Sequence, residues 1–389
     1  MWGGASPAPA RTRQREGALV AAWPGAPIAT LEREGIPFRR VEELLGAEGL
    51  AAADGAARTW ARVWGRLPLA DGKSFRELVE WRGSSLLWSA TAFLLEETAG
   101  PRCARTAEVA LRLLEATAAP EVDVSGLTPV EGLLLSRACT ARGVLFHGRE
   151  GAAKRPLTVV RPPARSRLGR ALAGALAPAG PPPPPLPAAG AGLEAAPVLA
   201  LVGSEEERRS LGPLPNAVSE GLGRPVCAVS LDELPRWETR RAGRRIAEAE
   251  ARLRERHRQL AGTPGLAASY AHRGVGFADL AAGDLEALVQ GSLAAAVRRL
   301  EAAVELVDSA RPAAVLLAVS GRDERRSLVH ACAACGVGAV VLRARPSGET
   351  ARADGGPQPL AVLDWEAGLD PGSAVEALRE ASRGRVIAG

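Results

Sequence analysis

The chain has very little lysine, tyrosine, asparagine and methionine. Among its 389 residues two are Lys, whereas Tyr, Asn and Met occur once each. Alanine, in contrast, is the most frequent residue type, and nearly all basic residues are Arg. A preference for Ala and Arg over Lys, Tyr, Asn and Met along a whole chain is typical of a GC-rich genome. The net charge of +5 and the pI of about 9.3 are therefore weak indicators of a nucleic-acid partner, and we expect none.

Long apolar runs are missing as well. The most apolar stretch, 171–192, is interrupted by the prolines 181–185, so no membrane span is predicted. The segment 1–17 carries charge without a following apolar segment, which argues against a signal peptide. Cysteine is sparse and odd in number, which argues against a disulfide framework and for a reducing compartment. These features predict a cytoplasmic protein.

Composition and periodicity divide the chain into five parts. A disordered N-terminus, 1–16, precedes a first Rossmann-like unit, 17–150, which we call the first half. A Pro/Ala/Gly-rich linker, 151–195, leads to a second Rossmann-like unit, 196–345, the second half, and to a C-terminal strand and helix, 346–389. Short apolar strands that alternate with helical segments predict an α/β fold with parallel sheets.

Two segments have a second interpretation. The proline run at 181–187 is typical of a polyproline II linker, and a docking site for a proline-binding module is the alternative. The charge-dense stretch 236–262 predicts a solvated helix, and an arm for nucleic acid is the alternative. Acids interrupt the Arg series of that stretch, which favours the solvated helix.

The two halves resemble each other, which predicts an internal duplication. Arg137–Val144 matches His330–Val337 at an offset of 193 (330 minus 137), and Gly35–Phe38 matches Gly223–Val226 at an offset of 188 (223 minus 35). The ends of one half thus recur in the other in the same order. We expect two Rossmann-like units with a ligand cleft between them, and Cys139 and Cys332 at equivalent places.

The best candidate site lies at two turns of the second half that end a strand and open a helix. A small residue at such a turn lets a backbone N–H approach a phosphate, and the helix N-terminus favours its negative charge. Helix capping by Ser and Gly is the simpler explanation of both turns. The candidate ligand-binding residues are Gly203, Ser204, Ser320, Gly321 and Arg322, with Glu324 as a weak candidate for catalysis.

The remaining reactive residues favour structural roles. Cys332 and Cys335 form a CxxC near His330, but at the end of a predicted helix and without a second ligand pair, so packing is favoured over redox or zinc chemistry. No metal or cofactor is predicted. His272 and Arg273 lie in a polar patch that could line the cleft or, as we favour, anchor a loop. Four tryptophans are expected to form the core of the first half, with sugar stacking as the alternative: Trp60, Trp64, Trp81 and Trp88.

Four segments together resemble a known family. They are LPLADGKSFRELVEWRGSSLLW, YAHRGVGFADL, RLEAAVELVDSARPAAVLLA and RRSLVHACAACGVGAVVLR. In this order they resemble the amino-terminal part of bacterial surface-polysaccharide glycosyltransferase-like proteins, as do Arg311–Leu316 and Gly336–Val340. The resemblance implies two Rossmann-like domains in a GT-B arrangement. Leu342-Arg343-Ala344 stands where that family has Gln-His-Gly, and no carboxyl-terminal donor domain is evident.

Two functions follow as hypotheses. The first is a GT-B-like protein of surface-polysaccharide biosynthesis, either a glycosyltransferase with a nucleotide-sugar donor or a degenerate relative. The alternative is a non-catalytic α/β binding or scaffold protein with two duplicated units, which would hold a small ligand or a protein partner. No paired carboxylates, metal cluster or phosphate loop occur in the sequence, which favours the alternative.

Overall fold

The chain is an α/β protein that forms two compact units. The computed structural model describes residues 20–23, 28–35, 37–66, 68, 72–118, 120–122, 127–147, 196–261, 263–343, 357–364 and 370–383. Unit 1 comprises Met1–Trp64, Thr98–Val159 and Pro264–Asp284, and unit 2 comprises Gly65–Glu97, Val160–Thr263 and Leu285–Gly389. The predicted disordered N-terminus and the predicted linker lie outside the described residues.

Each unit takes a segment from the other half of the sequence. Residues 65–97 of the first half belong to unit 2, and residues 264–284 of the second half belong to unit 1. This division differs from the continuous units 17–150 and 196–345 expected from the sequence. Composition marks the linker between the halves, but it carries no signal of a segment that packs elsewhere.

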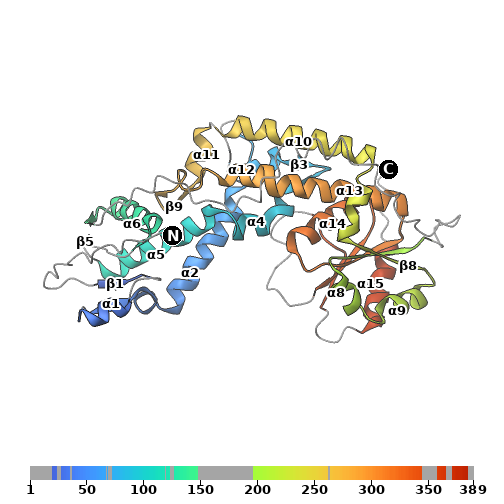
Figure 1. Cartoon of the computed structure of the whole chain (residues 1–389), viewed down its shortest axis with the longest axis horizontal. Coiled ribbons are helices and arrows are strands. Elements are labelled where there is room, and N and C mark those ends of the chain that lie inside the picture. Colours follow the sequence, from blue (N-terminus) through green and yellow to red (C-terminus); the bar gives the residue numbers. More distant parts are fainter. Residues whose placement is uncertain are drawn as a thin grey trace, which may run out of the picture. The chain divides into compact units, whose positions relative to one another are not determined.

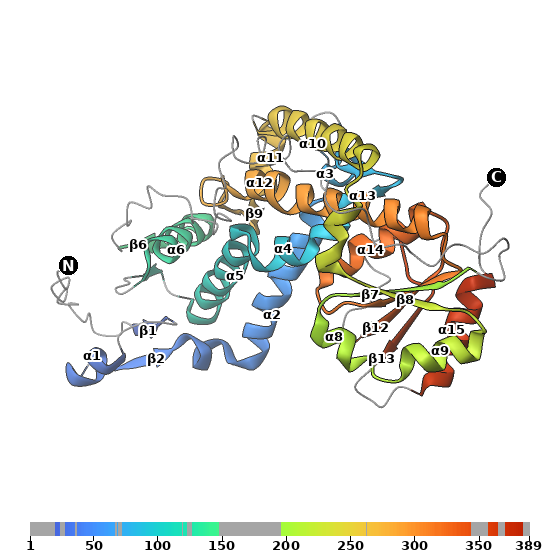
Figure 2. The same ribbon diagram turned by 45° about the vertical axis from the view of Figure 1, so that its right-hand side comes forward.

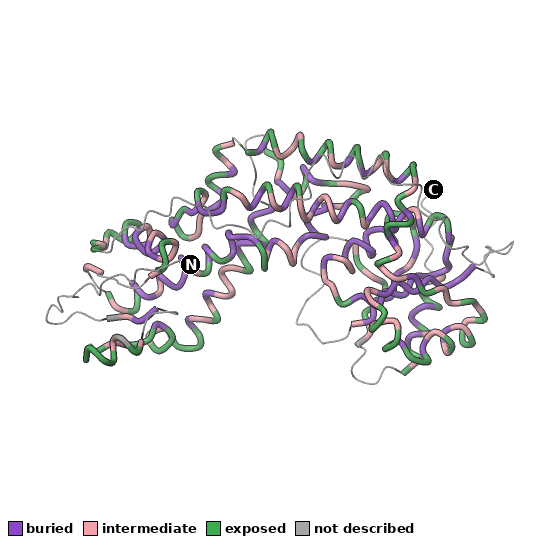
Figure 3. The backbone as a smooth tube through the Cα atoms, in the orientation of Figure 1, coloured by how far each residue is buried: buried purple, intermediate pink, exposed green. Residues whose placement is uncertain are grey.

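A five-stranded, wholly parallel sheet forms the centre of unit 2. Its strands lie in the order β13-β12-β11-β7-β8. Their bounds are β7 Val198–Val202, β8 Val226–Ser230, β11 Ala314–Ala318, β12 Ala339–Arg343 and β13 Ala361–Asp364. The runs VLALV and AVLLA are apolar at every position because both faces of these strands are buried, as Figure 3 shows for the centre of unit 2. The order is that of a doubly wound sheet, which reverses between β7 and β11.

Helices cover both faces of this sheet (Figures 1 and 2). One face packs on α9, Leu214–Leu222, and α15, Pro371–Arg383, through Val218, Ala374 and Leu378. The alternate strand residues, such as Leu199 and Leu317, are equally buried and lie toward α13, Ala294–Ala310, and α14, Arg322–Ala334. The predicted C-terminal strand and helix are therefore β13 and α15, which complete the sheet.

A long amphipathic helix, α10, Arg240–Leu260, runs alongside α13 in Figures 1 and 2. Its apolar residues, among them Ile246 and Leu253, recur every three or four positions and are buried, whereas most arginines of its other faces are exposed. The predicted solvated helix is confirmed. Shorter elements of unit 2 are α3 Phe75–Leu78, β3 Glu80–Trp81, β4 Ser84–Ser85, η1 Leu86–Ala90, α4 Thr91–Glu96, α8 Glu205–Ser210, η3 Leu231–Trp237 and the π-helix η4 Leu288–Leu293.

Unit 1 is mainly helical. In Figures 1 and 2, α2, Val41–Trp64, lies along α5, Ala99–Thr117, and α6, Pro129–Arg142, also packs on α5. Its described strands form three separate pairs, the parallel pairs β1–β2 and β5–β6 and the antiparallel pair β9–β10, rather than one broad sheet. The short elements are β1 Val20–Ala22, α1 Ile28–Arg33, β2 Phe38–Arg40, β5 Glu121–Val122, β6 Leu145–Phe146, α11 Pro264–Ser269, β9 Ala271–His272 and β10 Val275–Gly276; α12, Asp284–Ala287, begins at the end of the unit.

The four tryptophans predicted to form one core are divided between the units. Trp60 packs against Trp64, Tyr270 and Phe277, and Trp64 packs against Tyr270, all within unit 1 and with ring centroids 5.6–6.0 Å apart. Trp81 and Trp88 belong to unit 2, because the segment that carries them packs there. The prediction was therefore wrong for two of the four.

Candidate functional site

The predicted ligand-binding turns meet at the carboxyl edge of the unit 2 sheet. Gly203 and Ser204 follow β7, and Ser320 and Gly321 follow β11, the two strands between which the strand order reverses. The Gly203 N–H donates to the Ala318 carbonyl over 3.1 Å, which joins the two turns. The structure thus brings these four residues together at the place where doubly wound sheets bind ligands.

Carboxylates of the chain itself fill this edge. Ser204 caps α8 by accepting a hydrogen bond from the Glu207 N–H, and the Glu207 side chain turns back to accept a 2.8 Å hydrogen bond from the Ser320 N–H. A Cβ at Gly203 would overlap Glu207, and one at Gly321 would overlap Glu324. A phosphate at this edge would have to displace the Glu207 carboxylate and to lie close to that of Glu324.

The two charged candidates of α14 lie beside the same edge. Arg322 is the first residue of the helix and is half-buried. The Glu324 carboxylate is engaged by Arg299 of α13, over 3.2 Å, in an ion pair that is partly open to solvent. The ion pair with Arg299 occupies one oxygen of the Glu324 carboxylate, so this contact works against Glu324 as a general base.

The CxxC motif lies at the end of α14, as the sequence predicts. Cys332 is fully buried and Cys335 follows the last helical residue. Burial raises the pKa of the Cys335 thiol to about 12 and that of Cys332 further still. Thiols in this state are inert, which fits a packing role. In the described part of the chain, no group of three or more His, Cys, Asp or Glu side chains could hold a metal ion.

A buried carboxylate in unit 2 holds the β3–β4 hairpin on α13. Glu301 has no exposed side-chain surface, and it accepts hydrogen bonds from the Trp81 indole at 2.7 Å and from Arg82 at 2.6 and 2.8 Å. Arg245 of α10 adds a longer contact of 3.3 Å to the same group. The four side chains tie the hairpin, α13 and α10 together.

The charge of Glu301 is stabilised by these partners. Burial pushes the pKa of this carboxyl upward, but the hydrogen bonds from Arg82 and Trp81 outweigh it and leave the pKa below the ordinary value. The hydrogen bond to Glu301 correspondingly raises the pKa of Arg82. Both groups therefore remain ionised over the whole physiological range of pH.

An arginine-rich groove, which we call the arginine groove, opens between this hairpin and α10. Its volume is about 620 Å³. Four arginines, two glutamates, a tryptophan and a glycine line it: Arg82, Arg241, Arg245, Arg252, Glu80, Glu248, Trp81 and Gly83. The four residues from α10 follow one another at spacings of four, three and four, so they share one face of the helix.

The arginines of the groove fall into two kinds. Arg82 and Arg245 are fixed by the buried Glu301. The guanidinium groups of Arg241 and Arg252 are exposed, and within the described ranges neither forms a hydrogen bond or ion pair. An exposed, unpaired guanidinium beside a fixed one can take a phosphate or carboxylate with two parallel hydrogen bonds.

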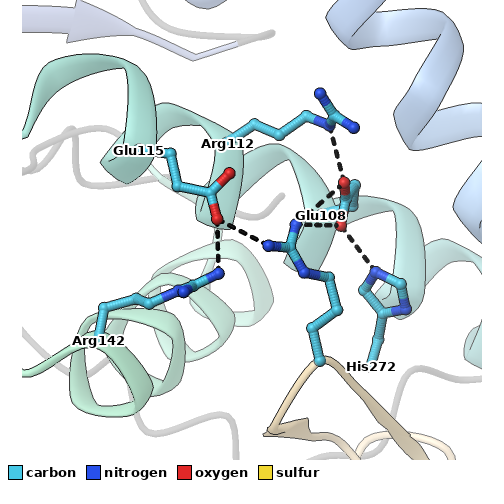
Figure 4. Close-up of polar contacts among 6 residues, drawn as sticks. Glu108, Arg112, Glu115, Arg142 and His272 are labelled. Carbon is cyan, nitrogen blue, oxygen red and sulfur yellow. Dashed lines mark hydrogen bonds and ion pairs between the residues drawn. The ribbon is translucent and has the colours of Figure 1, made fainter.

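Unit 1 contains a related anchor. Glu108 of α5 is nearly buried, and its carboxylate contacts His272 at 2.8 Å, Arg273 at 3.1 Å and Arg112 at 2.7 Å (Figure 4). Arg273 also contacts Glu115, which accepts a second hydrogen bond from Arg142. The predicted anchoring role of the polar patch is confirmed, since His272 and Arg273 hold the β9–β10 hairpin on α5.

Neither buried glutamate was among the sequence candidates, although a signal was present. Each is an acid flanked by apolar residues in a helical stretch, Glu108 in AEVALRLL and Glu301 in LEAAV. The two hairpin tips also share an Arg-Gly pair, Arg82-Gly83 and Arg273-Gly274. A buried acid needs a cationic partner, so the repeated pair is where that partner could have been sought.

Comparison with known proteins gives no further guidance, since the chain matches no family, no curated protein and no solved structure. In the described part of the chain, no helix combines the length and apolar character that a membrane crossing requires.

Proposed function

We propose that this chain is a non-catalytic α/β binding protein with two duplicated halves, and that unit 2 takes a small phosphorylated ligand in the arginine groove. The observation that carries the proposal is the pair of unpaired, exposed guanidinium groups, Arg241 and Arg252, on the groove wall. A nucleotide or nucleotide sugar fits this chemistry: the arginines would hold its phosphates, and Trp81 offers an aromatic surface to its base.

The duplication is supported by matching details of the two units. Strand β5 pairs with β6 so that Glu121 faces Leu145, and β11 pairs with β12 so that Val315 faces Ala339; the separation along the chain is the same in both pairs (145 minus 121 and 339 minus 315). The carbonyls of Cys139 and Cys332 each accept a 2.9 Å hydrogen bond from the N–H five residues later. Both cysteines are fully buried.

Because the halves are duplicated, the groove residues of α10 in unit 2 can be compared with the equivalent positions in unit 1. Arg105 of α5 pairs with Asp54 of α2, and Arg298 of α13 pairs with Glu250 of α10, which aligns α2 with α10 at an offset of 196 (250 minus 54). At the positions aligned with Arg241, Arg245, Glu248 and Arg252, α2 has Leu45, Gly49, Ala52 and Ala56. The hairpin and its buried anchor recur, but Arg241 and Arg252 have no counterparts in α2, so these two arginines are not needed to hold a hairpin in place.

A second candidate is the nucleotide-sugar-dependent glycosyltransferase of GT-B type, or a degenerate relative. What favours it is the gathering of Gly203, Ser204, Ser320 and Gly321 at the edge where the strand order reverses. The Glu207 carboxylate occupies the Ser320 N–H that a donor diphosphate would use. The negative charge of Glu207 would repel a diphosphate, so we favour the arginine groove as the ligand site.

A thermal-shift panel of nucleotides and nucleotide sugars tests both candidates. We expect at least one phosphorylated compound to stabilise the protein, by about 2.7 kcal/mol at a concentration one hundred times its Kd. The double variant Arg241→Ala/Arg252→Ala should lose this stabilisation. Arg244→Ala is the matched control, because Arg244 is an exposed arginine of α10 that does not line the groove.

The outcomes separate the candidates. Stabilisation that survives in the groove variant but is lost in Arg322→Ala would place the ligand at the sheet edge and favour the transferase. A panel without any stabilisation would overturn the phosphorylated-ligand proposal for both sites. Turnover of a nucleotide sugar by the wild-type chain would overturn the non-catalytic part alone.

A further inference from the structure

The β3–β4 and β9–β10 hairpins are equivalent in detail. Every strand position of the first hairpin has a counterpart in the second at an offset of 191 (271 minus 80). Each hairpin is closed by the same backbone hydrogen bond, from Leu86 N–H to the Val79 carbonyl and from Phe277 N–H to the Tyr270 carbonyl. Their tips are Arg82-Gly83 and Arg273-Gly274.

Backbone conformation repeats in the same way. Four non-glycine residues among those described have a positive φ, and they fall into two pairs. Arg82 and Arg273 both have a φ of 48° and are related by the hairpin offset of 191 (273 minus 82). Ala118 and Arg311, at 46° and 44°, each end a helix and are related by an offset of 193 (311 minus 118). Such conformations are rare for residues with a Cβ, so a match at both places points to a common origin.

The anchors cross between the halves of the sequence. Glu301 of the second half holds Trp81 and Arg82 of the first half, within unit 2. Glu108 of the first half holds His272 and Arg273 of the second half, within unit 1. The two glutamates are related by an offset of 193 (301 minus 108). In each unit, a glutamate at the equivalent helical position binds the equivalent hairpin, and that hairpin comes from the opposite half of the sequence.

We infer that the two halves exchange their hairpin segments, so that each unit is completed by the other half of the chain. This arrangement is that of a swapped dimer whose two copies are joined in one polypeptide. The partner of each half is thus a second copy of its own fold. The inference rests on the proposed duplication and is independent of the ligand of the arginine groove.

The exchange has a direct physical consequence for each buried acid. Glu301 is completely enclosed and Glu108 nearly so. A buried carboxylate without a cationic partner is strongly unfavourable. Arg245 and Arg112 contribute to these sites from the same half, but the shortest contacts of Glu301 come from the exchanged hairpin. The charge of Glu301 therefore depends mainly on the first half, and that of Glu108 depends in part on His272 and Arg273 of the second half.

Cleavage between the halves tests the inference on the full chain. A protease site inserted between residues 147 and 196 allows the folded protein to be cut there. We expect the two fragments to elute together as a 1:1 complex without denaturant. In Arg82→Gln/Arg273→Gln the fragment Kd should rise by a factor of about 100. The control Arg105→Gln removes an exposed ion pair within the first half and should leave the Kd within about threefold of the parent.

Double-mutant cycles on the uncut chain distinguish exchange from ordinary domain contact. The pairs Arg82/Glu301 and Arg273/Glu108, each changed to Gln, should be coupled by about tenfold in the unfolding equilibrium constant. The pairs within one half, Arg82/Glu108 and Arg273/Glu301, should be additive. Coupling of the within-half pairs, or fragments that separate spontaneously after cleavage, would overturn the inference. If the Gln variants do not fold, Arg82→Lys and Arg273→Lys supply the same cycles with the charge retained.

Discussion

The guanidinium of Arg82 forms a two-pronged contact with the carboxylate of Glu301, a distant residue in the sequence, with distances of 2.6 and 2.8 Å. This contact connects the candidate site with the fold. On one side it fixes the hairpin that carries Trp81 into the wall of the arginine groove. On the other it joins segments from opposite halves of the sequence, as Arg273 and Glu108 do in unit 1.

Replacement of Arg82 by Ala should destabilise the protein markedly. The change leaves Glu301 with Trp81 and Arg245 only, and the loss of one partner of a buried ion pair costs about 3 kcal/mol. Urea unfolding of the variant measures the loss. The control is Arg105→Ala, which removes an exposed ion pair with Asp54 and should cost less than about 1 kcal/mol. Equal losses in the two variants would show that the Glu301 anchor is not a special source of stability.

Acid should destabilise the fold through the two buried glutamates. For Glu108, as for Glu301, burial raises the pKa, but the hydrogen bonds from its partners outweigh this and leave the pKa below the ordinary 4.5. The unfolded chain then binds more protons than the folded chain, so stability is complete above about pH 4.5 and falls as the pH drops through the folded-state values.

The variant Glu108→Gln/Glu301→Gln isolates this effect. Its stability should be lower than that of the wild type at pH 7 and should depend less steeply on pH below 4.5. Chemical denaturation at a series of pH values provides the comparison. Parallel curves for the two proteins would contradict the assignment of the acid dependence to these carboxylates.

The sequence predicted the local structure well, because local signals are carried by neighbouring residues. Thr128 and Glu131 form the expected capping box of α6, and Gly143 ends the helix in a left-handed conformation. The runs VLALV and AVLLA are the central strands of the sheet, and their apolar positions explain why both faces are covered. The turns after β7 and β11 lie together at one edge, which their order along the chain already implied.

The exchange of hairpins could not be predicted in this way. Periodicity shows that Trp81 and Trp60 lie in structured segments, but it does not show against which helix each packs. Contacts such as Arg82 with Glu301 join segments from opposite halves of the chain, and no local signal selects one buried acid over another. The arginine groove could not be predicted for a similar reason. Its walls come from two distant segments, and in an Arg-rich sequence the four arginines that line it do not stand out.

A buried histidine should add a second pH dependence near neutrality. His330 is 1% exposed, and neither ring nitrogen has a hydrogen-bond partner among the described residues. Burial lowers its pKa from 6.5, so the folded chain disfavours the proton that the unfolded chain accepts. Stability should therefore be complete above about pH 6.5 and decline as the pH falls toward 5.

The variant His330→Leu should abolish this decline, because the apolar side chain cannot bind a proton in either state. His257→Leu is the control, since His257 is a half-exposed residue of α10. Melting temperatures from pH 5 to 7.5 give the readout. A decline that persists unchanged in His330→Leu would assign it to another group.

The packing of α2 on α5 in unit 1 depends on a glycine. Gly100 lies directly against Trp60, and a Cβ at this position would overlap the six-membered part of the indole. The ring cannot move away, because it is 7% exposed and packs on Trp64, Tyr270 and Phe277. Gly100→Ala should therefore destabilise the protein by about 1–3 kcal/mol, as overpacking of a filled core does.

Gly132→Ala provides the matched comparison on α6. A Cβ at Gly132 would meet no atom within 4 Å, and alanine in a helix is favoured over glycine by about 0.5–1 kcal/mol. The two substitutions are chemically identical, yet we expect opposite signs: a lower melting temperature for Gly100→Ala and an equal or higher one for Gly132→Ala. Because the effect of Gly100→Ala arises from the indole, Trp60→Leu should relieve the clash. The double variant should then be more stable than the sum of the two single changes predicts, and strict additivity would contradict the contact.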